Sequence, residues 1–418
     1  MMFEAICIFE DAKVQDLYPL TLTRPACELR CGMSSLREKI VKEFQPRRIL
    51  LQCRRYLAGA VREETGIDPA APPPAGDVLL VNGRLLADGG LMRQIETKEP
   101  CAFWCGEELV AAWLPAAKLQ TMWERLGDFL EPEWLADLPR VEVEATLIRW
   151  PWDLVHHNGA EIAREFQLLG VGGQVLGKVY PNVALVGREN IFVGERAELW
   201  PGVVIMAEED PVYIAEGAKI MANATIVGPA YIGPNTAIKI GAKIYEGTSI
   251  GEVCKVGGEV EESIIHSFSN KQHDGFLGHA YLGMWVNIGA DTNNSDLKNN
   301  YAPVRVQIND RVVDTGSLFV GLFMGDHTKT GINTMFNTGS VVGVACNVYG
   351  EGFPPRYIPS FHWGGAAGLT KYDLEKTLET ARRVMARRNR VLTLAQEAVL
   401  RHVYEMPVPP ILDRGVKI

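Results

Sequence analysis

Residues 214–256 read IAEGAKIMANATIVGPAYIGPNTAIKIGAKIYEGTSIGEVCKV, and this stretch decides the fold. An apolar β-branched residue recurs at every sixth position: Ile214, Ile220, Ile226, Ile232, Ile238, Ile244, Ile250 and Val256. On a helix a step of six residues turns the chain by about 600°, which scatters these side chains, whereas in extended chain an even step returns them to one face. The stretch therefore predicts a parallel β-helix of hexapeptide repeats.

The repeat extends on both sides of this stretch and sets the domain boundaries. The period of six is interrupted twice, and we interpret the interruptions as excursions from the coil near residues 263–281 and 293–311, where binding faces form in solenoids. The predicted organisation is an α/β domain over residues 1–150, a linking helix over 151–170, a β-helix over 171–355, and a helical segment over 356–418 with one amphipathic helix from Thr370 to Glu405.

The first 150 residues alternate short apolar strands with amphipathic helices. The predicted strands are Ala5–Phe9, Arg48–Gln52 and Val78–Val81, and the predicted helices are Ser35–Glu43 and Ala117–Leu126. This alternation is typical of an α/β domain.

Composition excludes several classes of function. The net charge of −9 argues against a nucleic-acid partner, and no run of about 18 apolar residues exists to span a membrane. Acidic residues stand at the start of the chain where a secretory signal needs basic and then apolar residues, so we expect a cytoplasmic protein. The eight cysteines lack the spacing of a zinc site, and no metal site is predicted.

Two histidines lie in glycine-flanked segments of the predicted β-helix. His279 falls in the first predicted excursion, where a loop held by a rigid coil is suited to present an imidazole to an amine or hydroxyl. His327 lies on the regular period near a predicted corner, where either a structural role or a contact to an acyl donor or sugar phosphate is open.

The segments GHAYLG (278–283) and VNIGADT (286–292) resemble the acetyltransferase domain of the bifunctional N-acetylglucosamine-1-phosphate uridylyltransferase/glucosamine-1-phosphate acetyltransferase family, the GlmU type. The resemblance implies a left-handed β-helix and an acetyl-coenzyme A donor. It also implies roles for individual residues: His279 as general base, Tyr281, Asn287 and Lys298 as substrate contacts, and Asn300 and Tyr301 beside the acetyl-coenzyme A.

The segments LYPLT (17–21) and TRP (23–25) resemble the opening of sugar-1-phosphate nucleotidyltransferases, which implies a Rossmann-like N-terminal domain. Arg24 is the implied contact for a phosphate or sugar nucleotide. The family's phosphate loop is altered, because Ala12 and Val14 stand in place of glycines, and Arg84 replaces the aspartate that holds Mg²⁺. Mg²⁺ is therefore expected only if this domain is active.

The leading hypothesis is an acyltransferase of sugar-phosphate or nucleotide-sugar metabolism, with a small-molecule substrate and a homotrimeric assembly implied by the resemblance. One alternative is an active sugar-1-phosphate nucleotidyltransferase that forms a UDP- or dTDP-sugar, and another is a non-catalytic nucleotide-sugar sensor or scaffold. A trimeric metalloenzyme of the γ-carbonic-anhydrase type would need imidazoles from among His266, His273, His279 and His327, whose spacing does not match that pattern.

Overall fold

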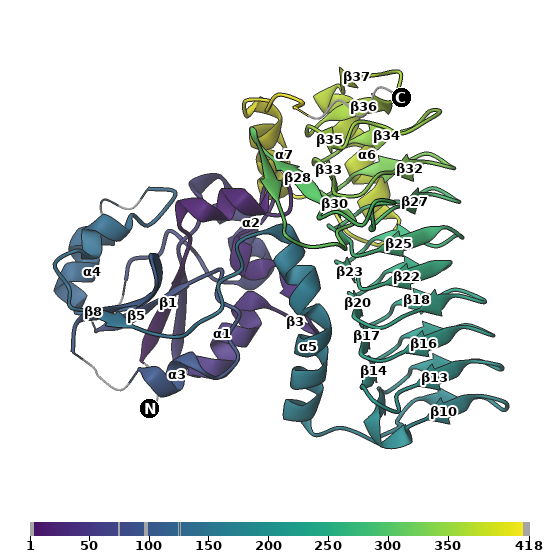
Figure 1. Cartoon of the computed structure of the whole chain (residues 1–418). Helices are drawn as coiled ribbons and strands as arrows, with labels where there is room; N and C mark the ends of the chain where they lie inside the picture. The colour runs from purple at the N-terminus through teal and green to yellow at the C-terminus, as the bar shows by residue number, and fades with distance from the viewer. Residues whose placement is uncertain (1–3, 74–75, 96–98, 124, 126, 413–418) are drawn as a thin grey trace.

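The computed structural model describes residues 4–73, 76–95, 99–123, 125 and 127–412 (Figure 1). Its N-terminal part is an α/β domain around a mixed six-stranded sheet in the order β4-β1-β5-β7-β6-β8, with β1 parallel to β4 and β5. The strands are β1 Ala5–Phe9, β4 Arg48–Leu51, β5 Val78–Asn82, β6 Cys101–Cys105, β7 Glu108–Leu114 and β8 Arg140–Glu142. The three strands predicted from sequence are confirmed.

Helices cover this sheet and connect it to the rest of the chain. They are α1 Leu36–Phe44, α2 Ala58–Thr65, α3 Leu91–Gln94, α4 Ala116–Trp123 and α5 Pro151–Leu169. Ser35 caps α1 through a capping box with Glu38, and Gly170 ends α5 in the left-handed conformation. The linking helix is confirmed as α5, which lies between the α/β domain and the coil (Figure 1).

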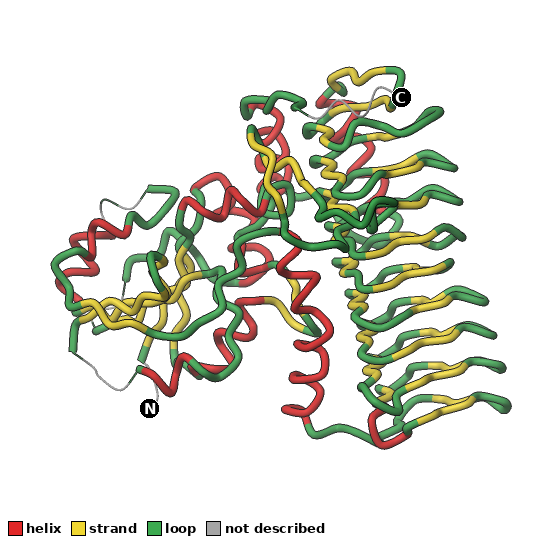
Figure 2. Tube along the Cα trace, in the orientation of Figure 1, coloured by secondary structure: helices red, strands yellow, loops and turns green. Residues whose placement is uncertain are grey.

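The β-helix consists of three parallel sheets whose strands follow one another around each coil (Figure 2). The first contains β10 Ala184–Val186, β13 Val204–Met206, β16 Thr225–Val227, β19 Lys243–Ile244, β22 Glu259–Glu261 and β25 Phe276–Gly278. The second contains β11 Ile191–Val193, β14 Val212–Ile214, β17 Ala230–Ile232, β20 Thr248–Ile250, β23 Ile264–Ile265, β26 Tyr281–Leu282, β30 Leu322–Met324, β33 Ser340–Val342 and β35 Tyr357–Ile358. The third contains β9 Lys178–Val179, β12 Glu198–Leu199, β15 Lys219–Ile220, β18 Ala237–Ile238, β21 Lys255–Val256 and β24 Asn270–Lys271. In the upper coils β27 Asn293–Asn294 and β32 Met335–Phe336 follow β25 of the first sheet. There β31 Lys329–Thr330 and β34 Asn347–Val348 follow β24 of the third sheet.

The six-residue repeat forms the interior of this coil. All eight recurring residues from Ile214 to Val256 are at most 1% exposed and belong to one hydrophobic cluster. Consecutive repeats fall on the three sheets in turn, since every third recurring residue pairs with the one before it: Ile214 with Ile232, and Ile232 with Ile250. The parallel β-helix predicted from this stretch is confirmed.

The predicted excursion over residues 263–281 is wrong, because β23, β24, β25 and β26 all remain in the three sheets. The inward residues of this part are Val260, Ile265, Lys271, Leu277 and Leu282, so some steps shorten to four or five residues. Lys271 occupies one inward position, only 1% exposed, and its ammonium donates to two backbone carbonyls. The short steps and the buried lysine explain why the sequence pattern did not reveal that the coil continues through residues 263–281.

The second predicted excursion is real but shifted along the chain. After β27 the chain leaves the coil, forms the antiparallel hairpin β28 Arg305–Ile308 and β29 Arg311–Asp314, and returns at β30. Residues 356–371 also differ from the prediction, because β35 and β36 His362–Gly365 extend the coil and β36 pairs with β37 Gly368–Lys371.

The single C-terminal helix predicted over Thr370–Glu405 is wrong. Two helices, α6 Leu374–Ala386 and α7 Leu394–Glu405, are separated by a break and pack against each other, and α7 also packs on α2. Residues 413–418 of the predicted segment lie outside the described residues. Within the described part of the chain, no helix combines the length and the apolarity that crossing a membrane requires.

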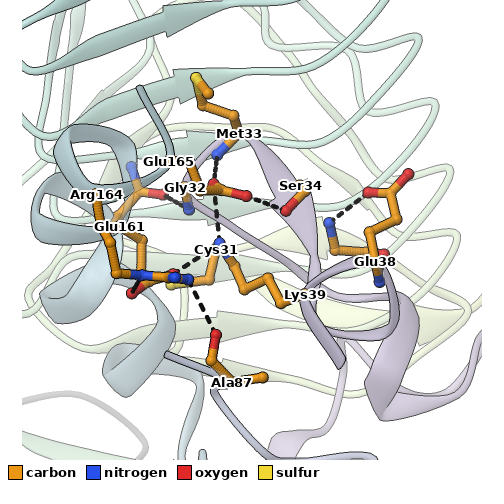
Figure 3. Close-up of polar contacts among 12 residues, drawn as sticks. Cys31, Gly32, Met33, Ser34, Glu38, Lys39, Ala87, Glu161, Arg164 and Glu165 are labelled. Atoms are coloured by element: carbon orange, nitrogen blue, oxygen red, sulfur yellow. Dashed lines mark hydrogen bonds and ion pairs between the residues drawn. The ribbon is translucent and has the colours of Figure 1, made fainter. Parts of the chain in front are cut away.

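A buried charge cluster attaches the α/β domain to α5 (Figure 3). Lys39 of α1, whose side chain is 1% exposed, lies 2.7 Å from Glu161 and 2.8 Å from Glu165 of α5. Burial alone would raise the pKa of Glu161, but hydrogen bonds from Arg164 and the charge of Lys39 lower it. Arg164 also donates to the backbone of Ala87, so both sides of the interface share the cluster.

The hairpin of β2 Arg30–Cys31 and β3 Ser34–Ser35 continues this attachment to the coil. Asn158 of α5, fully buried, accepts from the backbone N–H of Gly32 and donates to the carbonyl of Gly247 in the β-helix. Gly32 has φ +74°, and a Cβ there would lie 2.5 Å from a carboxylate oxygen of Glu165. The site thus requires glycine.

Replacing Lys39 with methionine is expected to lower the free energy of unfolding by about 3–5 kcal/mol, because the buried carboxylates of Glu161 and Glu165 lose the ammonium they share, and Arg164 remains beside Glu161. Equilibrium unfolding in urea measures this loss. Arg47→Met, at an exposed pair with Glu4, is the control and should change stability by about 0–1 kcal/mol. A loss for Lys39→Met as small as that of the control would contradict the structural importance of the cluster.

Candidate active site at a corner of the β-helix

His279 lies at a corner of the coil, between β25 and β26, with φ +46°. The prediction that it stands on a loop outside the coil is therefore wrong, because residues 276–282 are part of the coil itself. Its main chain is fixed on both sides, with the N–H donating to Glu261 and the carbonyl accepting from Gly321. A corner position still directs the ring outward from the packed interior.

The ring of His279 is held by the beginning and the end of the excursion. Its Nδ1 lies 2.8 Å from a carboxylate oxygen of Asp296, and both side chains are 15% exposed. Phe319 stacks on the imidazole with ring centroids 5.1 Å apart. The carbonyl of Asp296 accepts from the N–H of Val320, which closes the excursion around the histidine.

This geometry is suited to proton transfer through the other ring nitrogen. A carboxylate on Nδ1 fixes the tautomer and the orientation of the ring, and it stabilises the imidazolium that forms when Nε2 takes a proton. His156 approaches from α5, with its Nε2 3.2 Å from the carbonyl of Phe319, and burial followed by the charge of His279 lowers its pKa against the opposing effect of that carbonyl.

Two further carboxylates, those of Glu261 and Glu262, lie close enough to His279 for its charge to affect their pKa values. Burial raises the pKa of Glu261 and of Glu262; at Glu261 the charge of Asp296 adds to the rise, and at both residues the charge of His279 opposes it. An imidazolium at position 279 would therefore be formed among negative charges. Sequence reasoning found the histidine but missed Asp296 and Phe319, because their separation from His279 along the chain gave no local signal.

Tyr281 does not join this site. It is fully buried, packs outward from the coil against the α/β domain, and its hydroxyl accepts from the backbone N–H of Arg30 at 2.9 Å. Its neighbours Ala280 and Leu282 point into the coil, so alternation along the strand directs the tyrosine into the domain interface. The predicted substrate contact at Tyr281 is corrected to a structural role.

Asn287 is also separated from His279. It forms isolated bridges to Asn270 and Lys329 on the third sheet, and its side-chain oxygen lies 3.4 Å from the amide nitrogen of Asn270. Arg388, in the break after α6, donates to the other side of Asn270. Within one chain, His279 and Asn287 therefore belong to different edges of the coil.

The remaining predicted contacts lie on the excursion. Lys298 donates to the carbonyl of Pro303 at 2.6 Å, Asn300 accepts from the N–H of Ala302, and Tyr301 is 69% exposed. Lys298 and Asn300 line an open hollow of about 680 Å³ with Ser295, Leu297, Asn299, Asn337, Phe353 and Arg356. Ser295 and Leu297 flank Asp296, so this hollow adjoins the histidine site.

The place expected for nucleotide phosphates in the α/β domain is filled by ion pairs. Arg84, fully buried, donates twice to Asp11 and once to the carbonyl of Ile148. Arg54 forms a second buried pair with Glu10, with its Nε 3.0 Å from the carboxylate. Arg84, which stands in place of the aspartate expected to hold Mg²⁺, is thus neutralised by a carboxylate of the protein.

Arg24 likewise forms an ion pair within the chain. Its guanidinium, 5% exposed, pairs with Asp326 of the β-helix, and Thr23 donates to the same carboxylate. Among the residues that the structure describes, no group of three or more His, Cys, Asp or Glu side chains is arranged to hold a metal ion.

Comparisons with known proteins also point to a nucleotidyltransferase-like part and an acyltransferase-like part. Residues 6–172 match the family model described as sugar nucleotidyl transferase. The bifunctional sugar-1-phosphate nucleotidylyltransferase/acetyltransferase of Sulfurisphaera tokodaii is 29% identical over 199 residues, 48% of this chain and 43% of that protein. The bifunctional protein GlmU of Methanocaldococcus jannaschii is 27% identical over 54% of this chain and 44% of that protein. The bifunctional protein GlmU of Bartonella quintana is 24% identical over 78% of this chain and 71% of that protein.

The solved structures that match include the UDP-N-acetylglucosamine acyltransferase from Campylobacter jejuni, at 12% identity and a TM-score of 0.25, covering 56% of this chain and 99% of that one. The chain spans less than half the length of the first two relatives. It is similar to the bifunctional proteins at these identities and coverages, and the predicted enzyme class, transferase, is that of the names these relatives carry. The predicted fold class is confirmed: a nucleotidyltransferase-like α/β domain, a left-handed parallel β-helix and C-terminal helices.

The α/β domain is expected to release no pyrophosphate from UTP or dTTP with Mg²⁺ and a sugar 1-phosphate, because Arg84 and Asp11 neutralise each other where a nucleotide and metal would bind. A coupled pyrophosphate assay with the full chain measures this, and an active sugar-1-phosphate nucleotidyltransferase serves as the positive control. Mg²⁺-dependent release that Arg84→Met abolishes would overturn the expectation.

Proposed function

We propose that this protein is an acyltransferase in which His279 is the general base and Asp296 positions it. The observation that supports the proposal is the 2.8 Å contact of Nδ1 with Asp296, together with a ring that is mostly covered but not sealed from solvent. The proposed acceptor is an amino group on a sugar phosphate or nucleotide sugar, and the proposed donor is acetyl-coenzyme A. The name of one bifunctional relative includes a sugar 1-phosphate and acetyl transfer, which supports this choice.

In the proposed reaction the acceptor amine attacks the thioester carbonyl and Nε2 of His279 removes its proton. The amide bond forms, the carbon–sulfur bond breaks, and the coenzyme A thiolate leaves and is protonated. Asp296 keeps Nδ1 protonated and stabilises the imidazolium during the attack. Backbone N–H groups of the coil would stabilise the oxyanion.

The hollow beside Asp296 is the proposed place of the acyl donor. Lys298 and Arg356 bring positive charge to it, Asn300 brings an amide, and Tyr301 is exposed on the same excursion. A homotrimer would complete such a site, because Asn287 lies on another edge of the coil and could approach His279 only from a neighbouring subunit. Analytical ultracentrifugation tests the trimer.

His279→Gln is expected to lower kcat/KM about 10²- to 10⁴-fold, because glutamine cannot take the proton from the amine. The measurement follows acetyl transfer from labelled acetyl-coenzyme A to a panel of amino-sugar phosphates. Asp296→Asn should cause a smaller loss, since the ring stays in place while its tautomer is no longer fixed.

Tyr281→Phe is the matched control on the adjacent strand. It removes one buried hydrogen bond to the α/β domain, so the free energy of unfolding should fall by about 1–3 kcal/mol while kcat/KM stays near the wild-type value. Turnover that persists in a folded His279→Gln variant would reject the role of His279. Binding of a nucleotide sugar without turnover by the wild-type chain would favour the sensor alternative instead.

A further inference from the structure

A second cavity, separate from His279, lies where the α/β domain, the β-helix and the C-terminal helices meet. Its volume is about 630 Å³, within the range of roughly 300–1,000 Å³ typical of small-molecule sites, which favour domain interfaces. Helix α2 and the start of α7 form one side of it, and these two helices pack together (Figure 1). Corner residues of three successive coils form the other side.

The floor of this cavity holds two buried polar atoms that no described residue satisfies. Arg24 uses one side of its guanidinium for Asp326, but its buried Nη1 has no hydrogen-bond partner among the described residues. The buried Nδ1 of His327 likewise has none within the described part of the chain. Burying a polar atom without a hydrogen bond is costly, so two such atoms in one cavity call for a partner that is not part of the chain.

The wall beside them is a column of aromatic rings at successive coil corners. The ring centroids of Phe268 and Trp285 are 4.5 Å apart, and those of Trp285 and His327 are 6.2 Å apart, with both pairs stacked. The guanidinium carbon of Arg390 lies 5.4 Å from the centroid of the Phe268 ring and covers the far end of the column. All three ring residues have φ near +60°, a conformation that is strained for a bulky side chain and that glycine or asparagine adopts readily. Lower coils place Asn235 at the equivalent corner.

The charges of the cavity select the kind of ligand. On the floor, Arg24 and Asp326 cancel, and His327 is neutral because burial and then Lys329 lower its pKa to about 3, against the opposing effect of Asp326. At the mouth, three carboxylates outnumber the single guanidinium of Arg390: Glu63, Glu64 and Glu252. Negative charge entering this cavity is therefore repelled, while neutral hydrogen-bonding groups and amines are accepted.

We infer that this cavity is a binding site for a small polyhydroxylated ligand of hexose size that is uncharged or carries an amine. Its hydroxyl oxygens accept from Nη1 of Arg24, a hydroxyl or amine pairs with Nδ1 of His327, and an amine at the outer end pairs with the carboxylates. The site contacts all three parts of the chain, so ligand binding stabilises their arrangement. This inference does not depend on the acyl transfer proposed at His279.

Saturation-transfer NMR of the full chain with glucose, glucosamine and glucose 6-phosphate tests the site. Signals are expected for glucose and glucosamine, with a weaker signal or none for the phosphate. His327→Phe should weaken binding about tenfold, the loss of one hydrogen bond of about 1.4 kcal/mol. Phenylalanine already occupies equivalent left-handed corners at Phe268 and Phe361, so this variant preserves the ring and the fold.

Two more variants make the result decisive. Ala60→Phe fills the cavity from α2 and should abolish the signals, whereas His279→Gln should leave them intact, which separates this site from the proposed active site. The inference is overturned if none of the three probes gives a signal. It is also overturned if His327→Phe and Ala60→Phe bind as the wild type does, or if a crystal structure shows ordered waters alone paired to Arg24 and His327.

Discussion

The stacking of each coil on the one before it is the constraint on which the other features depend. Parallel pairing in three sheets places equivalent residues of successive coils directly above one another, about 4.8 Å apart. Inward positions therefore become one continuous apolar core, and corner positions become columns on the surface. The aromatic column of Phe268, Trp285 and His327 is such a corner column, and its spacing is set by the coil.

The same constraint explains where His279 and its partners lie. Each corner allows only a short connection, so a histidine there has a fixed main chain and a side chain directed outward. Asp296 and Phe319 reach it because the excursion leaves the coil after β27 and returns at β30, one coil above. An insertion in a solenoid must begin and end at neighbouring points, and the histidine lies between them.

The sequence predicts those parts whose signal is periodic and local. Regular six-residue steps over 214–256 were sufficient for the β-helix, and helical spacing was sufficient for α5. The coil over 263–281 was missed because Lys271 occupies an inward position, where its ammonium is stabilised by two carbonyls that no sequence pattern reveals. The pairs His279–Asp296 and Arg24–Asp326 join residues 17 and 302 positions apart, so only the folded chain brings them together.

Electrostatics distinguishes the two halves of the molecule. In the α/β domain, arginines that could meet an anion are instead paired with Glu10 and Asp11, and the carboxylates that could hold a cation are neutralised in the same contacts. A buried ion pair contributes little net stability, yet breaking it is costly, so these pairs persist where the resemblance leads one to expect nucleotide phosphates. At the interface, by contrast, Arg24 and His327 have buried polar atoms with no hydrogen-bond partner among the residues that the structure describes, beside an open cavity. Arg24 comes from the α/β domain and His327 from the β-helix, so the hydrogen-bonding capacity that the fold leaves unused lies at the junction of the two parts.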